Sequence, residues 1–108
     1  MSEPSPETQL IALNLAFPAA IEEDMIDFCH DQVALMSGFT LSTAAGFGDG
    51  ARLHSAAEVV RGRAERRLLT SVVAADNLEP LLDALRLVLP SPEIVYWTTP
   101  VTSFGRLK

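Results

Sequence analysis

Arginines form a basic cluster in the middle of an otherwise acidic chain. Residues 52–67 contain five arginines and only two acids, and the arginines are Arg52, Arg61, Arg63, Arg66 and Arg67. Each guanidinium can hold a carboxylate or phosphate through two parallel hydrogen bonds. The cluster therefore predicts either a site for an anionic ligand or a set of ion pairs, formed with Glu58 and Glu65 or with the acidic first helix of a neighbouring subunit.

A glycine-rich segment, Gly46-Phe47-Gly48-Asp49-Gly50, precedes this cluster. Alternate glycines allow backbone N–H groups to approach a ligand closely. The spacing does not match the dinucleotide fingerprint, because Ala51 stands where the last glycine is needed, and no Lys-Ser or Lys-Thr follows as in a P-loop. The segment is expected to open a loop over residues 45–62, which is long enough for a functional role.

Three residues are candidate metal ligands: Cys29, His30 and His54. Cys29 lies on an apolar helical stripe, and its neighbour His30 points about 100° away, so Cys29 is expected in the core. His30 and His54 remain candidates for a divalent transition metal, with carboxylates from across a subunit interface completing the site. No serine has the context of a nucleophile elbow, and Cys29 lacks a partnered base. We therefore expect a protein that is not an enzyme. A small α+β-barrel enzyme remains an alternative, after the two non-enzymatic functions described below.

The length of 108 residues predicts a single domain, residues 9–108, after a disordered leader over residues 1–8. A net charge of −6 argues against a general binder of nucleic acid or anionic membranes. The acidic N-terminus lacks the features of a signal peptide, and the chain has no apolar run of about 18 residues. With only one cysteine, these features predict a cytoplasmic protein that does not insert into membranes.

Hydrophobic periodicity predicts four strands and two helices. The strands are expected over residues 9–17, 39–44, 63–74 and 93–99, and the helices over about 18–35 and 76–89. A cap-like sequence at Asp76-Asn77 marks the start of the second helix. The order β-α-β-β-α-β predicts an α+β, ferredoxin-like domain, with a four-stranded antiparallel sheet and both helices on one face.

The second face of this sheet is expected to be bare and apolar. It would carry Leu10, Ala12 and Ala16, together with one register of residues 68–73 and 95–99. Tyr96 and Trp97 must point to opposite sides, so that one joins the core and the other lines the second face. A patch of this kind predicts self-association with closed cyclic symmetry.

Over residues 9–108 the chain resembles the PII-like superfamily, and within it a branch often encoded beside heavy-metal efflux systems. The resemblance rests on the order of elements, on Gly46-Phe47-Gly48 at the start of the long loop and on the run from Ser55 to Gly62 that closes it. It also rests on the ending Tyr96-Trp97-x-x-Pro100-Val101, followed by Gly105-Arg106.

The resemblance implies a homotrimer that binds a small molecule or ion as effector in clefts between subunits and signals to a partner protein through the 45–62 loop. Gly46, Phe47 and Gly48 match the base of that loop, and Arg106 matches a C-terminal basic residue that reaches the same cleft. Arg61 and Arg63 are the arginines of the basic cluster that we expect to contact the effector.

The ligand implied by the resemblance is an adenine nucleotide or a divalent transition metal, and the partner is a membrane transporter or efflux protein. The alternative is a metal-binding accessory protein for transition-metal efflux. The chain departs from signalling PII proteins in two places. Pro90-Ser91-Pro92 stands where a glycine- and lysine-rich loop holds the nucleotide phosphates, and the modifiable loop tyrosine is absent. Sensing of ATP and 2-oxoglutarate is therefore not expected.

Overall fold

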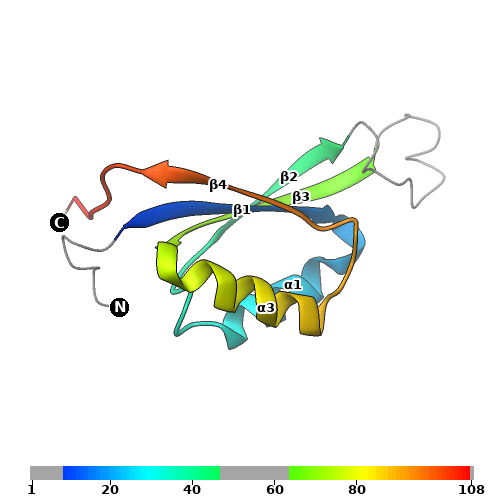
Figure 1. The fold of residues 1–108 in the computed structure, drawn as a ribbon. Helices are drawn as coiled ribbons and strands as arrows, with labels where there is room; N and C mark the ends of the chain where they lie inside the picture. The colour runs from blue at the N-terminus through cyan, green and yellow to red at the C-terminus, as the bar shows by residue number, and fades with distance from the viewer. Residues whose placement is uncertain (1–8, 47–63, 108) are drawn as a thin grey trace.

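One antiparallel sheet organises the part of the chain that a computed structural model describes, residues 9–46 and 64–107. Its strands are β1 (Leu10–Pro18), β2 (Thr40–Gly46), β3 (Ala64–Ala74) and β4 (Val95–Val101), in the order β2-β3-β1-β4. Helices α1 (Glu22–Asp31) and α3 (Leu78–Val88) both lie against one face of the sheet (Figure 1). The expected α+β, ferredoxin-like fold is confirmed.

Alternation along β1 creates the core. Leu13, Leu15 and Phe17 point toward the helices and are buried, whereas the residues between them point to the other face and remain partly exposed. Leu69 and Val73 of β3 join them on the helix side. The helices contribute Met25, Phe28, Cys29, Leu81 and Leu85 to the same cluster. Cys29 is thus a core residue, as its position on the apolar stripe predicts.

Helix α1 is shorter than the sequence pattern suggests. Pro18 ends β1, the 3-10 turn η1 (Ala19–Ile21) follows, and the α-helix occupies only Glu22–Asp31 of the expected 18–35. After it, the N–H groups of Leu35 and Met36 both donate to the Gln32 carbonyl, at 2.9 and 2.8 Å. This turn buries Met36 but leaves Val33 65% exposed.

Helix α3 begins with a 3-10 turn, η2 (Ala75–Asn77), rather than with the expected side-chain cap. The Asn77 amide instead donates to the Leu35 carbonyl at 3.1 Å and so ties the start of α3 to the connection between α1 and β2. Leu81, Leu82 and Leu85 of the apolar stripe are buried, but Val88 is 59% exposed because the helix runs past the edge of the core. Among the described residues, no helix is long and apolar enough to span a membrane.

The face of the sheet away from the helices carries the residues expected there. The pairs Leu10↔Ala74, Ala12↔Val72 and Ala16↔Leu68 lie on it, and β4 adds Val95 and Trp97. Arg66, at one end, is the only charged residue of the described strands that alternation assigns to this face. We call this surface the open face.

Tyr96 lies on the helix side of β4, opposite in direction to Trp97. The expectation that one of these two aromatic residues joins the core is wrong. Since β4 is an edge strand, Tyr96 and Trp97 both remain nearly half-exposed.

Strand β2 extends further than expected, because Ala45 and Gly46 still pair with β3. The expected short helical turn at Ser55 and the leader over residues 1–8 lie outside the described residues. So do five of the candidate site residues: Phe47, Gly48, His54, Arg61 and Arg63.

Two leucine-to-alanine substitutions, one in the core and one on the surface, should change the free energy of unfolding by very different amounts. Leu69→Ala removes a fully buried side chain from the centre of β3 and should lower the free energy of unfolding by roughly 2–5 kcal/mol. Leu87→Ala, at an exposed position on α3, should change it by less than about 0.5 kcal/mol. Urea denaturation followed by circular dichroism measures both, and equal effects would contradict the assignment of the core.

Candidate functional site

The end of the sheet at Gly46 and Ala64 carries several polar contacts, among them those of Arg66 and Arg67. Gly46, the last residue of β2, pairs there with Ala64, the first residue of β3. The ends of β1 at Pro18 and of β4 at Val95 lie at the same end (Figure 1). The connection from α3 to β4, residues 89–94, also reaches this end.

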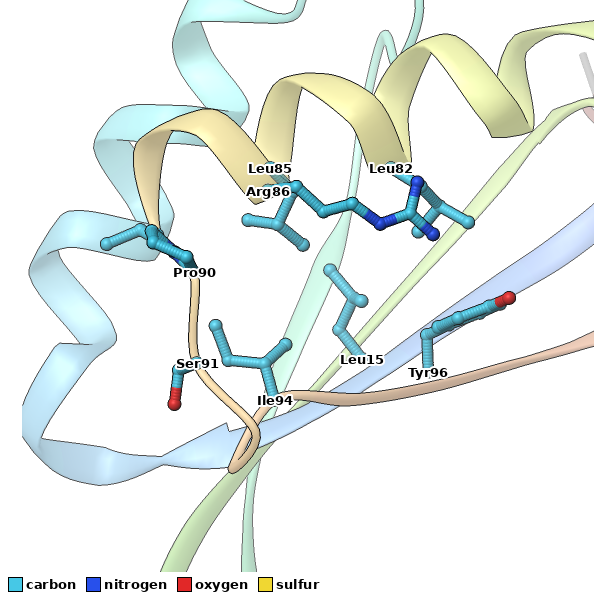
Figure 2. Close-up of a pocket in the computed structure, with 9 residues that line it drawn as sticks. Leu15, Leu82, Leu85, Arg86, Pro90, Ser91, Ile94 and Tyr96 are labelled. Atoms are coloured by element: carbon cyan, nitrogen blue, oxygen red, sulfur yellow. The ribbon is translucent and has the colours of Figure 1, made fainter.

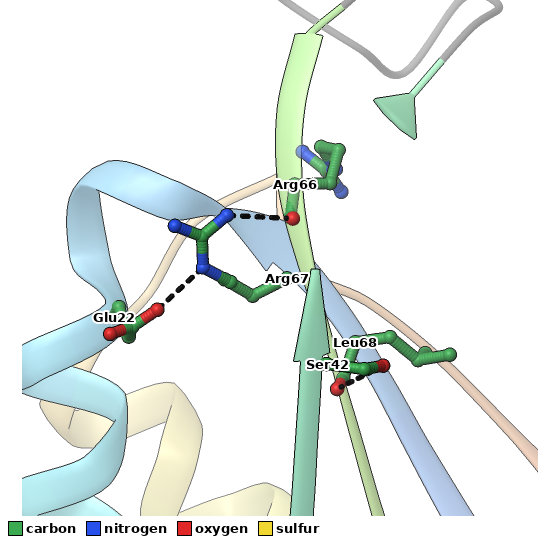
Figure 3. A network of polar contacts seen from close by, with 5 residues as sticks. All are labelled: Glu22, Ser42, Arg66, Arg67 and Leu68. Atoms are coloured by element: carbon green, nitrogen blue, oxygen red, sulfur yellow. Dashed lines mark hydrogen bonds and ion pairs between the residues drawn. The ribbon is translucent and has the colours of Figure 1, made fainter. Parts of the chain in front are cut away.

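Arg67 binds the first helix of its own chain. Alternation along β3 directs it to the helix side, where its Nε donates to Glu22 Oε1 at 2.5 Å and its Nη1 donates to the Arg66 carbonyl at 3.2 Å (Figure 3). Glu22 lies in the first turn of α1, together with Glu23 and Asp24, where acids also complement the helix dipole. Arg67 therefore forms an ion pair with the acidic first helix, as one of the two alternatives for the arginine cluster predicts, but the helix belongs to its own subunit.

Arg66 ties β3 to the connection between α3 and β4. It is only 6% exposed, pairs in register with Pro18 of β1, and donates from Nη2 to the Glu93 carbonyl at 2.8 Å. Its Nη1 is buried without a hydrogen-bond partner. The sequence could not reveal this role, because Glu93 accepts through its backbone, and a backbone acceptor carries no residue-type signal.

The connection between α3 and β4 is a tight turn in which several backbone N–H groups already donate hydrogen bonds within the turn. The Ile94 N–H donates to the Ser91 carbonyl at 3.2 Å, and the Glu93 N–H donates to the Ser91 hydroxyl at 3.1 Å. Pro90 and Pro92 have no N–H. Phosphate cradles depend on several free backbone N–H groups, so this turn is poorly suited to hold the phosphates of a nucleotide.

Two cavities flank the connection. One, of about 180 Å³, lies between α3 and β4 and is lined by leucines of α3 and by Ile94, with Arg86 and Tyr96 also among its lining residues (Figure 2). The other, of about 270 Å³, lies between η1 and the end of α3, with Pro18, Ile21 and Pro90 among its lining residues. The second cavity is mainly apolar and suits a small apolar group better than a phosphate, whereas the first exposes almost as much polar as apolar surface.

The candidate residues within the described ranges do not form one site in a single chain. Gly46 ends β2, whereas Arg106 follows β4 at the opposite end of the sheet (Figure 1). His30 is exposed in the last turn of α1, with its ring centroid 6.0 Å from that of Phe39. Arg106 is therefore too far along the sheet to meet Gly46 of its own chain, and the two residues could come together only if they belonged to different subunits.

Within residues 9–46 and 64–107, no group of three or more His, Cys, Asp or Glu side chains could hold a metal ion. Burial raises the pKa of the Cys29 thiol from 9.0 to about 11. Metal binding and nucleophilic attack both require the thiolate. Cys29 therefore stays protonated near neutral pH and is suited to neither role.

The ion pairs of Arg67 with Glu22 and of Arg86 with Asp83 should differ in strength. A double-mutant cycle with Arg67→Ala and Glu22→Ala should give a coupling free energy of about 1 kcal/mol, because both side chains are less than one-third exposed. The control cycle, on the exposed pair of Arg86 and Asp83, should give less than about 0.5 kcal/mol. Urea denaturation supplies the four free energies of each cycle. A coupling no larger than that of the control would show that Arg67 does not anchor α1.

Comparison with solved structures extends the likeness over nearly the whole chain. A DUF3240 family protein from Shewanella baltica is 25% identical, with a TM-score of 0.73 and coverage of 92% of this chain and 97% of that one. CPII from Thiomonas intermedia, a nitrogen regulatory PII-like protein bound to ADP, AMP and bicarbonate, is 18% identical, with a TM-score of 0.66 and coverage of 91% and 94%.

A third structure, the divalent ion tolerance protein CutA1 from Ehrlichia chaffeensis, is 10% identical, with a TM-score of 0.64 and coverage of 92% and 87%. At these identities CPII and CutA1 share the fold. No curated protein matches the chain. The model of one protein family, described as a protein of unknown function (DUF3240), matches residues 7–108. The chain therefore belongs to the DUF3240 family and has a PII-like fold.

Proposed function

We propose that this protein is a non-enzymatic PII-like regulator that assembles as a homotrimer and binds a small effector in the clefts between its subunits. The observation that carries the proposal is the open face. Most of its positions on β1, β3 and β4 are apolar, Trp97 is 43% exposed on it, and the helices pack against the other side of the sheet. A second copy of the chain would remove this surface from water, and closed cyclic symmetry is the usual arrangement.

The proposed effector is an anion, with an adenine nucleotide as the first candidate. The CPII structure, with ADP, AMP and bicarbonate, shows that a protein of this fold can hold such ligands. In this chain the proposed contacts are Gly46, Phe47 and Gly48 at the base of the loop, with the guanidinium groups of Arg61, Arg63 and Arg106. Arg106 would come from the neighbouring subunit, because it follows β4, whose last residue pairs with Leu10 at the far end of the sheet.

Signalling in this proposal passes through the 45–62 loop. Effector contacts made in only one loop conformation would shift the population toward that conformation. The loop would then bind a partner protein, for which a membrane transporter or efflux protein is the proposed class. The proposed location is the cytoplasm, where such a loop would meet the inner side of a transporter.

A second candidate is a metal-binding accessory role in transition-metal efflux. The shared fold with the divalent ion tolerance protein CutA1 favours it. His30 is exposed at the end of α1, and His54 would be the second ligand. Since the described residues provide no cluster of three ligands, this role needs residues from outside them or from a second subunit.

The proposed assembly has a defined mass. At micromolar concentration the chain should sediment as a single species of three times the 11.7 kDa of one chain, because the open face is apolar and carries few charges. Sedimentation equilibrium measures this mass directly. A monomer, or a dimer without any larger species, would contradict the proposed trimer.

Effector binding should depend on the Arg106 guanidinium. Calorimetric titration with ADP, AMP and bicarbonate should show binding of at least one of them, with roughly tenfold weaker affinity for Arg106→Ala and an intermediate loss for Arg106→Lys, which keeps the charge but not the fork of donors. Zn²⁺ and Cu²⁺, titrated into the wild type and into His54→Ala, test the metal-binding candidate. Binding of no anion would contradict the sensor proposal, and metal binding that is unchanged in His54→Ala would contradict the metal-binding alternative.

A further inference from the structure

A polar pair interrupts the apolar open face at its centre. Asn14 lies midway along β1, and its register partner on the adjacent central strand is Thr70. The Thr70 hydroxyl donates to Asn14 Oδ1 at 2.9 Å. Ala12, Ala16, Leu68 and Val72 flank the pair along the two strands. Thr40, the register partner of Thr70 on β2, lies on the same face, so polar side chains extend from the centre of the face to its β2 edge.

The pair does not satisfy its own hydrogen-bonding capacity. Asn14 Nδ2 makes only a long contact, 3.4 Å, to the Ala12 carbonyl, although an amide nitrogen carries two donors. Asn14 Oδ1 and Thr70 Oγ1 each retain acceptor capacity. A partner that covers the face with apolar side chains alone would leave these groups buried without partners, at a cost in free energy. The face therefore favours a partner that brings both a donor and an acceptor to this point.

We propose that this partner is a second copy of the chain, and that the Asn14 and Thr70 side chains of neighbouring copies hydrogen-bond to one another around the symmetry axis and fix the register of the assembly. This inference rests on the proposed function, because it requires the open face to be the subunit interface. The Asn14 amide is self-complementary: its Nδ2 can donate to the Oδ1 or to the Thr70 hydroxyl of the next copy. Cyclic symmetry repeats the same contact at every interface.

Charge also favours a second copy as the occupant. The chain has a net charge of −6, so two copies repel each other unless they meet over a surface without acids. The described strands place no Asp or Glu on the open face. A basic partner would find no acids to pair with on this face, whereas a second copy meets apolar and amide groups that match its own.

The expected role of the pair is specificity rather than affinity. Apolar contacts drive the association, while one buried amide per chain penalises every arrangement in which it lacks a partner, as a single interior asparagine does in a coiled coil. Replacing the pair by apolar side chains of similar size should therefore keep the chains associated but allow more than one arrangement. Replacing the amide by a charge should drive them apart.

Asn14→Asp tests whether residue 14 lies in the subunit interface, because the substitution adds a charge with almost no change in side-chain shape. The substitution lies on a face that is partly exposed in the single chain, so the monomer should fold, as circular dichroism can verify. At pH 8 the carboxylates of neighbouring copies would face each other, and the dissociation constant from sedimentation equilibrium should rise at least about a hundredfold. Association should recover toward pH 4 as these carboxylates take up protons. Ser37→Asp, on an exposed connection, adds the same charge away from the face and should associate like the wild type.

The double variant Asn14→Leu with Thr70→Val tests the register. It should remain associated but sediment as a mixture of species, where the wild type gives one. A wild type that assembles while Asn14→Asp matches Ser37→Asp at pH 8 would overturn the inference and leave the proposed function standing. So would a double variant that keeps the single species of the wild type. A monomeric wild type would instead overturn the proposed trimer, and the inference with it.

Discussion

The alternation of side chains along β1 is the constraint on which the rest of the structure depends. Because β1 pairs with both β3 and β4, its register sets which face every residue of the neighbouring strands joins. Leu13, Leu15 and Phe17 fill the space under the helices, and Asn14 lies between them on the opposite side. A slip by one residue would expose the core side chains and bury the amide. The core and the open face are thus fixed by the same register.

Side-chain hydrogen bonds to backbone carbonyls then attach the connections to this sheet. The Ser71 hydroxyl donates to the Gly38 carbonyl, Asn77 donates to Leu35, and Arg66 donates to Glu93. Each bond joins β3 or the segment directly after it to a connection between a helix and a strand. The adjacent residues Arg66 and Arg67 extend to opposite sides of β3, so one turns toward the β4 connection and the other toward α1. Part of the basic cluster therefore has a structural role.

The proposed site uses what remains of that cluster. In the turn between α3 and β4, the N–H groups of Leu89, Glu93 and Ile94 already donate within the chain, and one of the two adjacent cavities is mainly apolar. An anionic effector near this end of the sheet would thus depend on arginine side chains rather than on a backbone cradle. Arg106 follows β4, whose last residue pairs with Leu10 at the opposite end of the sheet, which is why the proposal places the site between subunits. The fold shared with CPII, which binds nucleotides and bicarbonate, supports that arrangement.

The sequence alone determined the order of strands and helices, the two faces of β1, the burial of Cys29 and the apolar character of the open face. These follow from local periodicity, which needs no knowledge of distant residues. Tertiary structure decided where the helices end, because Met36 and Asn77 gain contacts that periodicity does not encode. It also decided that Tyr96 stays exposed on an edge strand and that Arg66 and Arg67 bind a backbone carbonyl and Glu22. Contacts between residues far apart in the chain depend on how the elements meet in space, and composition and spacing do not specify that.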